Sequence, residues 1–201
     1  MSTANIVVKN GDELVKAQIE PYYDDNSATY TDNYQLVFLA DLKPLSANFY
    51  SLESALKPAS TAFAEILIIP QSGNVQQLSN NNFSRLFIVK NIAADQFVLD
   101  TPRLKTKHNL KTGFLESLTT SADSEFQIEQ TMVQYDSSGG GAYIMRSGSS
   151  EKPLSVEKLM RYIIKGPVRQ VAVIHTSALQ QWTSAIISDD FYGEILQIDM
   201  R

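Results

Sequence analysis

Short apolar runs separated by polar turns are the feature that most limits the folds open to this chain. The runs at 34–42 (YQLVFLADL) and 62–69 (AFAEILII) are rich in β-branched and aromatic residues, which are enriched in strands. Their continuous apolar character is typical of strands buried on both faces of a sheet. Similar runs follow at 85–91, 96–100 and 168–175. Strands are therefore expected to dominate the fold.

Turn signals and alternating patterns add further strands. Gly11-Asp12 separates the runs 5–9 and 14–20, which predicts a β-hairpin. Residues 125–130 and 194–200 alternate between apolar and polar, as expected of a strand with one buried face. The alternation shifts at Thr131–Met132, which predicts a β-bulge there. Residues 142–146 are expected to pair with 125–130 across the SSGGG turn.

Two segments near the C-terminus predict helices. Over 154–165 apolar residues recur at helical spacing, with Ser155 as a candidate N-cap and Gly166-Pro167 as a stop. A second helix is expected over 177–187, and a short one over 51–57. The predicted fold class is therefore α+β and strand-dominated, a largely antiparallel sheet or sandwich with two C-terminal helices (154–165, 177–187).

Length and composition predict one folded domain. The 201 residues, 43% of them hydrophobic, fit a single domain over 1–201, and the best candidate for a weak boundary lies near 137–153. The chain has no cysteine, which excludes disulfides, thiol catalysis and Cys-ligated metals. We expect no cofactor and no metal site. The N-terminus lacks the pattern of a signal peptide, so we expect synthesis in the cytoplasm, with release as part of a particle left open.

Charge is arranged in blocks. The net charge of −5 makes nucleic acid an unlikely partner, and no apolar run is long enough for a membrane helix. Residues 85–111 and 146–169 are each basic by about four charges, whereas 1–60, 112–136 and 170–201 are acidic. The blocks either neutralise one another within one fold or form faces of opposite sign. Such faces suit a homo-oligomer or contacts with neighbouring subunits of a larger assembly.

Two polar segments supply candidate interaction residues. The segment 22–34 contains Tyr22, Tyr23, Asp24, Asp25, Tyr30 and Asp32. Tyrosine-rich polar loops make good contact surfaces, and the spacing of a calcium-binding EF-hand is absent, so the segment is either a recognition or subunit-contact loop or a plain surface loop. The segment 102–111 contains Arg103, Lys105, Lys107 and Lys111. In an extended conformation most of these charges would share one side, as a stripe for an acidic partner or a solvated loop.

His175 is the weak candidate for catalysis. It ends the run 168–175, and Asp189 follows the predicted second helix. A hydrolase could use such a pair, but no GxSxG motif accompanies it, and a buried or rim histidine hydrogen-bonded to the backbone is the simpler interpretation.

Three functions are therefore carried forward. The first is a structural or assembly subunit of a multi-subunit particle, such as a virion or phage tail or neck component, acting through protein–protein contacts. The second is a non-enzymatic module that binds a ligand or protein. The third is a hydrolase-type enzyme using His175. The first is favoured because few residues suggest catalysis and long polar loops suggest contact surfaces.

Overall fold

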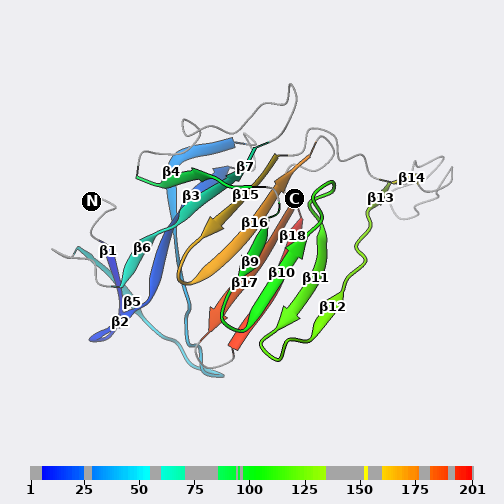
Figure 1. The fold of residues 1–201 in the computed structure, drawn as a ribbon. Coiled ribbons are helices and arrows are strands. Elements are labelled where there is room, and N and C mark those ends of the chain that lie inside the picture. Colours follow the sequence, from blue (N-terminus) through cyan, green and yellow to red (C-terminus); the bar gives the residue numbers. More distant parts are fainter. Residues whose placement is uncertain are drawn as a thin grey trace, which may run out of the picture.

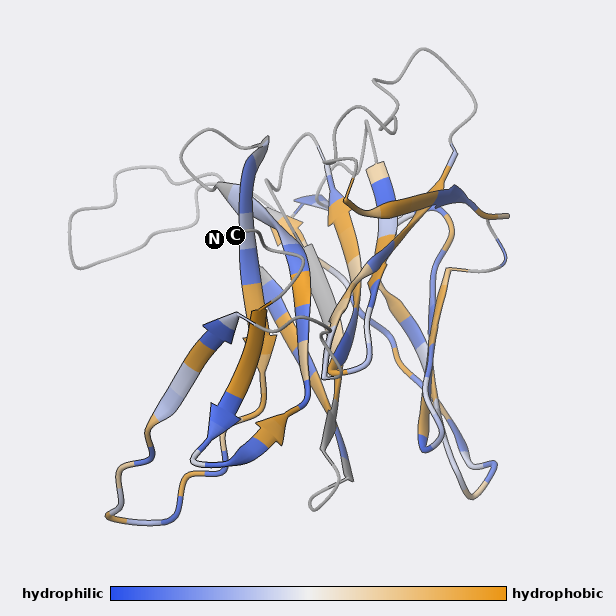
Figure 2. Ribbon diagram, turned by 90° about the vertical axis from the view of Figure 1, so that its left-hand side faces the viewer, coloured by the Kyte–Doolittle hydropathy of each residue, from blue (hydrophilic) through white to orange (hydrophobic). Residues whose placement is uncertain are grey.

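The fold is built from β-sheets. The computed structural model describes residues 6–24, 29–54, 60–70, 86–93, 95, 97–134, 152–153, 160–176, 182–189 and 193–200. Within these ranges the strands form five sheets, and most neighbouring strands are antiparallel (Figure 1). Hydrophilic and hydrophobic residues alternate along many of them (Figure 2). The strand-dominated, largely antiparallel character predicted from the sequence is confirmed.

A six-stranded sheet lies at the centre of the molecule. Its strands, in spatial order, are β18 (Gly193–Met200), β17 (Trp182–Asp189), β16 (Arg169–His175), β15 (Met160–Lys165), β7 (Glu65–Ile69) and β8 (Ile88–Asn91). All neighbours are antiparallel except β7 and β8, which are parallel. Since β15 and β16 lie inside this sheet, their side chains are buried along most of their length.

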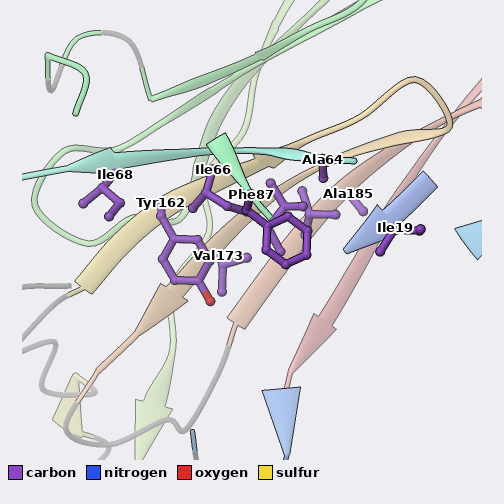
Figure 3. Packing of buried hydrophobic residues seen from close by; sticks show 10 residues of the cluster. Ile19, Ala64, Ile66, Ile68, Phe87, Tyr162, Val173 and Ala185 are labelled. Carbon is purple, nitrogen blue, oxygen red and sulfur yellow. The ribbon is translucent and has the colours of Figure 1, made fainter. Parts of the chain in front are cut away.

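A smaller sheet covers one face of the central sheet. Its order is β4 (Thr29–Phe38), β3 (Ala17–Asp24) and β6 (Thr61–Phe63). Ile19 of β3 belongs to a buried cluster with Ile66, Phe87 and Val173. Figure 3 shows this cluster from close by, together with Tyr162. Burial of these side chains at roughly 1.5–3 kcal/mol each holds the two layers together.

A four-stranded antiparallel sheet covers the opposite face. It contains β12 (Glu125–Gln127), β11 (Leu115–Thr120), β10 (Leu104–His108) and β9 (Val98–Asp100) in that order. Phe97 and Leu99 pack there against Ile163 and Ile174 of the central sheet. The Gln170 side chain adds a polar link, because it donates to the Asp100 carbonyl at 2.8 Å and accepts from the Asp100 N–H at 3.2 Å. The result is three β layers with two separate cores.

Two further small sheets contain the remaining strands of the described residues. The first contains β2 (Glu13–Val15), β1 (Ile6–Asn10) and β5 (Tyr50–Ser54), and the second pairs β13 (Val133–Gln134) with β14 (Lys152–Pro153). The predicted hairpin at Gly11-Asp12 is confirmed between β1 and β2, with Gly11 in the left-handed region at φ 61°. The expected second strand 14–20 is divided at Lys16 into β2 and β3.

The predicted C-terminal helices are wrong wherever the structure describes them. Residues 160–165 of the segment 154–165 form β15, and residues 182–187 of the segment 177–187 belong to β17. Residues 154–159 and 177–181 lie outside the described residues. The reason is that both faces of the central sheet are covered, so Tyr162, Ile163 and Ile164 are all buried. A strand without polar alternation resembles one side of a helix in sequence.

Other local predictions fared unevenly. Residues 51–54 of the predicted helix 51–57 are strand β5, so that prediction is wrong there. The run 62–69 is divided at Ala64, whose N–H bonds the Ile19 carbonyl where the chain passes between layers. The strand 125–130 ends at Gln127, although the Ile128 N–H still donates to the Glu116 carbonyl at 2.9 Å. Thr131–Met132, where a β-bulge was expected, lies outside any strand. Residues 142–146 and most of 137–153 lie outside the described residues.

Candidate functional site

A cavity lies between the β3–β4 hairpin and the central sheet. Its volume is about 280 Å³, and strands β3, β4 and β15 to β18 line it. The register of β3 against β4 shifts between Pro21 and Tyr23. This irregularity places Tyr22 and Tyr23, neighbours in sequence, both in the cavity wall. The cavity therefore depends on a local break in the hairpin.

The cavity wall has an apolar side and a polar side. The apolar side is formed by Ile164, Val171, Val173 and Ala185, which share one face of the central sheet. The polar side is formed by Gln35, Arg169, Gln197 and Asp199. Tyr22, Tyr23 and Tyr30 supply aromatic rings, and the rings of Tyr23 and Tyr30 meet edge to face with centroids 5.3 Å apart.

A buried carboxylate organises the polar side. Glu20 is fully buried, and Arg169 donates to both of its oxygens, from Nε at 2.9 Å and from Nη2 at 2.6 Å. Gln35 donates to the same carboxylate at 2.7 Å, and Gln18 donates as well. This ion pair is therefore bidentate and further hydrogen-bonded, as a buried charge requires.

Gln18 anchors the turn that presents Arg169. Its Oε1 accepts from the backbone N–H groups of Val168 at 2.7 Å and Arg169 at 2.9 Å. Gly166 lies so close to the Gln18 amide that a Cβ at this position would clash with it. The β15–β16 turn and the β3 strand are thus locked together beside the cavity.

A hydrogen-bonded chain leads from the cavity to His175. Tyr30 bonds the hydroxyl of Tyr162, and that hydroxyl lies 3.0 Å from Nε2 of His175. Tyr23 packs against the imidazole with ring centroids 5.1 Å apart. Burial raises the pKa of both Tyr30 and Tyr162 above the ordinary value. Both phenols therefore stay protonated at neutral pH and act as hydrogen-bonding groups.

Residues 22–24 and 29–34 of the Tyr- and Asp-rich segment belong to strands β3 and β4 in place of the predicted loop. Tyr22, Tyr23 and Tyr30 reach the cavity, whereas Asp32 is exposed on β4. The side chain of Asp24 and all of Asp25 lie outside the described residues. The interaction role of these residues stays a prediction.

The basic segment 102–111 contains strand β10, in agreement with the extended one of its two interpretations. Lys105 and Lys107 are exposed on β10, while Thr106 and His108 between them are buried. Arg103 and Lys111 are exposed beyond the strand ends. Lys105 lies 3.9 Å from Asp100, and Lys107 lies 3.6 Å from Glu116. Neighbouring strands of the same sheet thus partly neutralise the stripe.

The structure separates the two candidate catalytic residues. His175 is at the end of β16 that lies beside Trp182, whereas Asp189 is at the far end of β17. Seven residues of extended strand place their backbones on the order of 20 Å apart. The side chain of Asp189 lies outside the described residues. His175 is buried against two tyrosines, so the geometry gives this pair no shared site.

A second candidate site is an apolar arm, residues 39–49, which joins β4 to β5 (Figure 1). Leu42, Leu45 and Phe49 are 64%, 109% and 86% exposed. The arm is shaped by a turn in which the N–H and hydroxyl of Ser46 donate to the Lys43 carbonyl at 3.2 and 2.7 Å. The sequence predicted residues 39–42 as the end of a buried strand 34–42, but β4 ends at Phe38 and residues 39–42 are exposed, so that prediction is wrong there.

Comparisons with known proteins leave these sites to be judged on their geometry. No protein-family model matches the chain, and no curated protein matches it significantly. Among the described residues, no helix is long and apolar enough to cross a membrane. The same residues contain no group of three His, Asp or Glu side chains placed to hold a metal ion.

Proposed function

We propose that the protein is a structural or assembly subunit that binds further copies of itself or neighbouring subunits of a particle. The observation that carries the proposal is the exposure of large apolar side chains on the apolar arm. Three large apolar side chains, Leu42, Leu45 and Phe49, are exposed within one short segment, and exposed apolar surface beyond scattered single residues marks a contact site.

The conformation of the arm supports this role. Leu45 lies in the left-handed region at φ 57°, which is unfavourable for a branched side chain, and it is fully exposed. The Ser46 hydrogen bonds and the bond from Asn48 to the Asp41 carbonyl hold this shape. Burying Leu45 and Phe49 in a partner would contribute about 1.5–3 kcal/mol each. Strained backbone that displays an apolar side chain is typical of a contact point.

The edge of the central sheet offers a second contact. Among the described residues β18 pairs only with β17, so its other edge presents backbone hydrogen-bonding groups along eight residues. Ile195 and Ile198 are exposed on this strand. A strand from a neighbouring subunit can add to such an edge, which is a common mode of assembly.

A paired substitution in the arm tests the proposal. The Leu45→Ser/Phe49→Ser variant removes two exposed side chains, and Phe126→Ser on β12 is the control because Phe126 is also exposed. We expect the arm variant to lower the mass measured by light scattering, with an unchanged melting temperature, while the control keeps the parent mass. Equal masses for all three proteins over the same concentrations would contradict the proposal.

A further inference from the structure

We propose that Arg161 and the β10–β11 loop (residues 109–114) bind a carboxylate, supplied by a small acid or by an acidic side chain of another copy. Arg161 belongs to β15, where it lies beside Ile69 and Ile174 on the face of the central sheet opposite the cavity. The site goes beyond the contact function, and it depends neither on the apolar arm nor on the edge of β18. What points to it is a buried guanidinium that lacks a carboxylate.

The Arg161 guanidinium is buried without a neutralising charge. The residue is 8% exposed, and no carboxylate among the described residues forms an ion pair with it. Nη1 donates to the Leu110 carbonyl, while Nε is fully buried and meets no acceptor in the part of the chain that the structure describes. Burial lowers the pKa of Arg161 from its ordinary value, because the charge has lost solvation. A buried water would accept from Nε but leave the charge uncompensated, and such a charge is costly.

Arg169 shows, in the same chain, what Arg161 lacks. Nε and Nη2 of Arg169 donate side by side to the two oxygens of Glu20, at 2.9 and 2.6 Å. Nε and Nη2 of Arg161 form the same edge, and neither has an acceptor among the described residues. Two parallel N–H groups match the two oxygens of a planar carboxylate, whereas a phosphate brings further charged oxygens that one arginine edge leaves unpaired. The free edge of Arg161 therefore favours a carboxylate.

The β10–β11 loop is held against this part of β15. Oδ1 of Asn109 accepts from two backbone N–H groups of the same loop, at 2.9 and 3.0 Å. Gly113 lies so close to Ile174, the cross-strand neighbour of Arg161, that a Cβ at position 113 would clash with it. These contacts hold the Leu110 carbonyl at Nη1, so the guanidinium is oriented before a ligand binds.

The site is open to solvent on the side of the loop. Leu110 is 46% exposed, and Lys111 beside it is exposed and forms no ion pair with another described residue. Nη2 of Arg161 is neither hydrogen-bonded to the described residues nor closed off from solvent. A carboxylate attracted by the two positive charges therefore meets Nη2 first, and it reaches Nε through a side-chain movement of the kind that is common on binding.

Titration of the full chain with sodium acetate tests the site, with sodium chloride adjusted to keep the ionic strength constant. The Nε–H signals of arginine side chains in two-dimensional NMR report on the guanidinium, and Arg161→Met identifies the signal of Arg161. Arg161→Lys keeps the charge without the fork, and inorganic phosphate is the comparison anion. Arg103→Met is the control, because Arg103 is an exposed arginine of the same sheet layer, just before β10.

We expect acetate to shift the Arg161 signal with a millimolar dissociation constant. Acetate should also raise the melting temperature of the parent and of Arg103→Met, with no rise in Arg161→Met and an affinity about tenfold weaker in Arg161→Lys. In chloride alone Arg161→Met should be at least as stable as the parent, because it removes an uncompensated charge. A purely structural arginine would show the opposite, a loss of stability with no response to acetate.

Light scattering distinguishes the two sources of the carboxylate. If an acidic side chain of another copy occupies the site, acetate and Arg161→Met both lower the mass; if a small acid does, the mass is unchanged while acetate still binds. Three results would overturn the proposal: acetate up to about 100 mM leaves the Arg161 signal unchanged, it stabilises the parent and Arg161→Met equally, or phosphate binds more tightly than acetate. None of these results concerns the apolar arm, so the assembly proposal would be unaffected.

Discussion

His108 should make the stability of the folded protein depend on pH. The residue is 1% exposed on β10, where its ring packs 5.0 Å from that of Phe97. Its nitrogens lie near the Phe97 backbone but make no hydrogen bond of normal geometry to the described residues. Burial lowers the pKa of His108 from the ordinary 6.5 to about 4. The folded state therefore resists protonation at this ring.

The size and sign of the effect follow from proton linkage. Between pH 6.5 and 4 the unfolded chain binds a proton at His108 that the folded chain does not, so acid favours unfolding. The difference between the ordinary pKa of 6.5 and the pKa of about 4 in the folded chain corresponds to about 3 kcal/mol of unfolding free energy. This contribution to the free energy of unfolding is fully present above pH 6.5 and is lost as the pH falls from 6.5 to about 4.

The variant His108→Met isolates this contribution, because methionine is flexible and apolar and has a similar size. Urea unfolding followed by circular dichroism at several pH values between 4.5 and 7.5 measures the free energy of unfolding. We expect the variant to lose much less stability than the parent on acidification, and to gain about 1 kcal/mol at pH 7 from removal of an unpaired polar ring. The same loss in both proteins would refute the reasoning.

Two further predictions concern the residues beside the cavity. Gly166→Ala should lower the free energy of unfolding, measured with urea, by about 1–3 kcal/mol because the added Cβ displaces Gln18. Gly11→Ala, which has open space around it, should lower the free energy of unfolding by about 1 kcal/mol because of its left-handed backbone alone. Equal losses in the two variants would contradict the clash at Gly166. Glu20→Gln and Arg169→Met should each lower the free energy of unfolding by about 3–5 kcal/mol, and the double variant should lose clearly less than the sum of the two. Additive losses in this double-mutant cycle would argue against the ion pair.

Sequence patterns predicted the parts of the fold that depend on local chemistry. The Gly11-Asp12 turn and the strands at 168–175 and 194–200 are confirmed, because turn residues and β-branched runs carry their own signal. The alternation around Lys105 and Lys107 correctly placed their charges on one side of an extended segment. Each of these features is decided within a few neighbouring residues.

The features that failed or were missed depend on residues far apart in the chain. Residues 160–165 of the helix predicted over 154–165 form a strand because other layers cover both faces of the central sheet, and no local sequence pattern indicates that both faces are covered. Glu20 and Arg169 are 149 positions apart, so their pairing, and with it the cavity, has no sequence signal in one chain. Tyr23 and Tyr30 were singled out, but their place in the cavity wall follows from the hairpin register.

The mass of the unmodified protein in solution, measured by light scattering over rising concentration, is the most direct test of the assembly proposal. We expect the mass to rise in multiples of the 22.4 kDa chain, because the exposed side chains of the apolar arm and the edge of β18 are then buried between subunits. A mass that stays at one chain at every concentration, with no association with a neighbouring subunit, would contradict it.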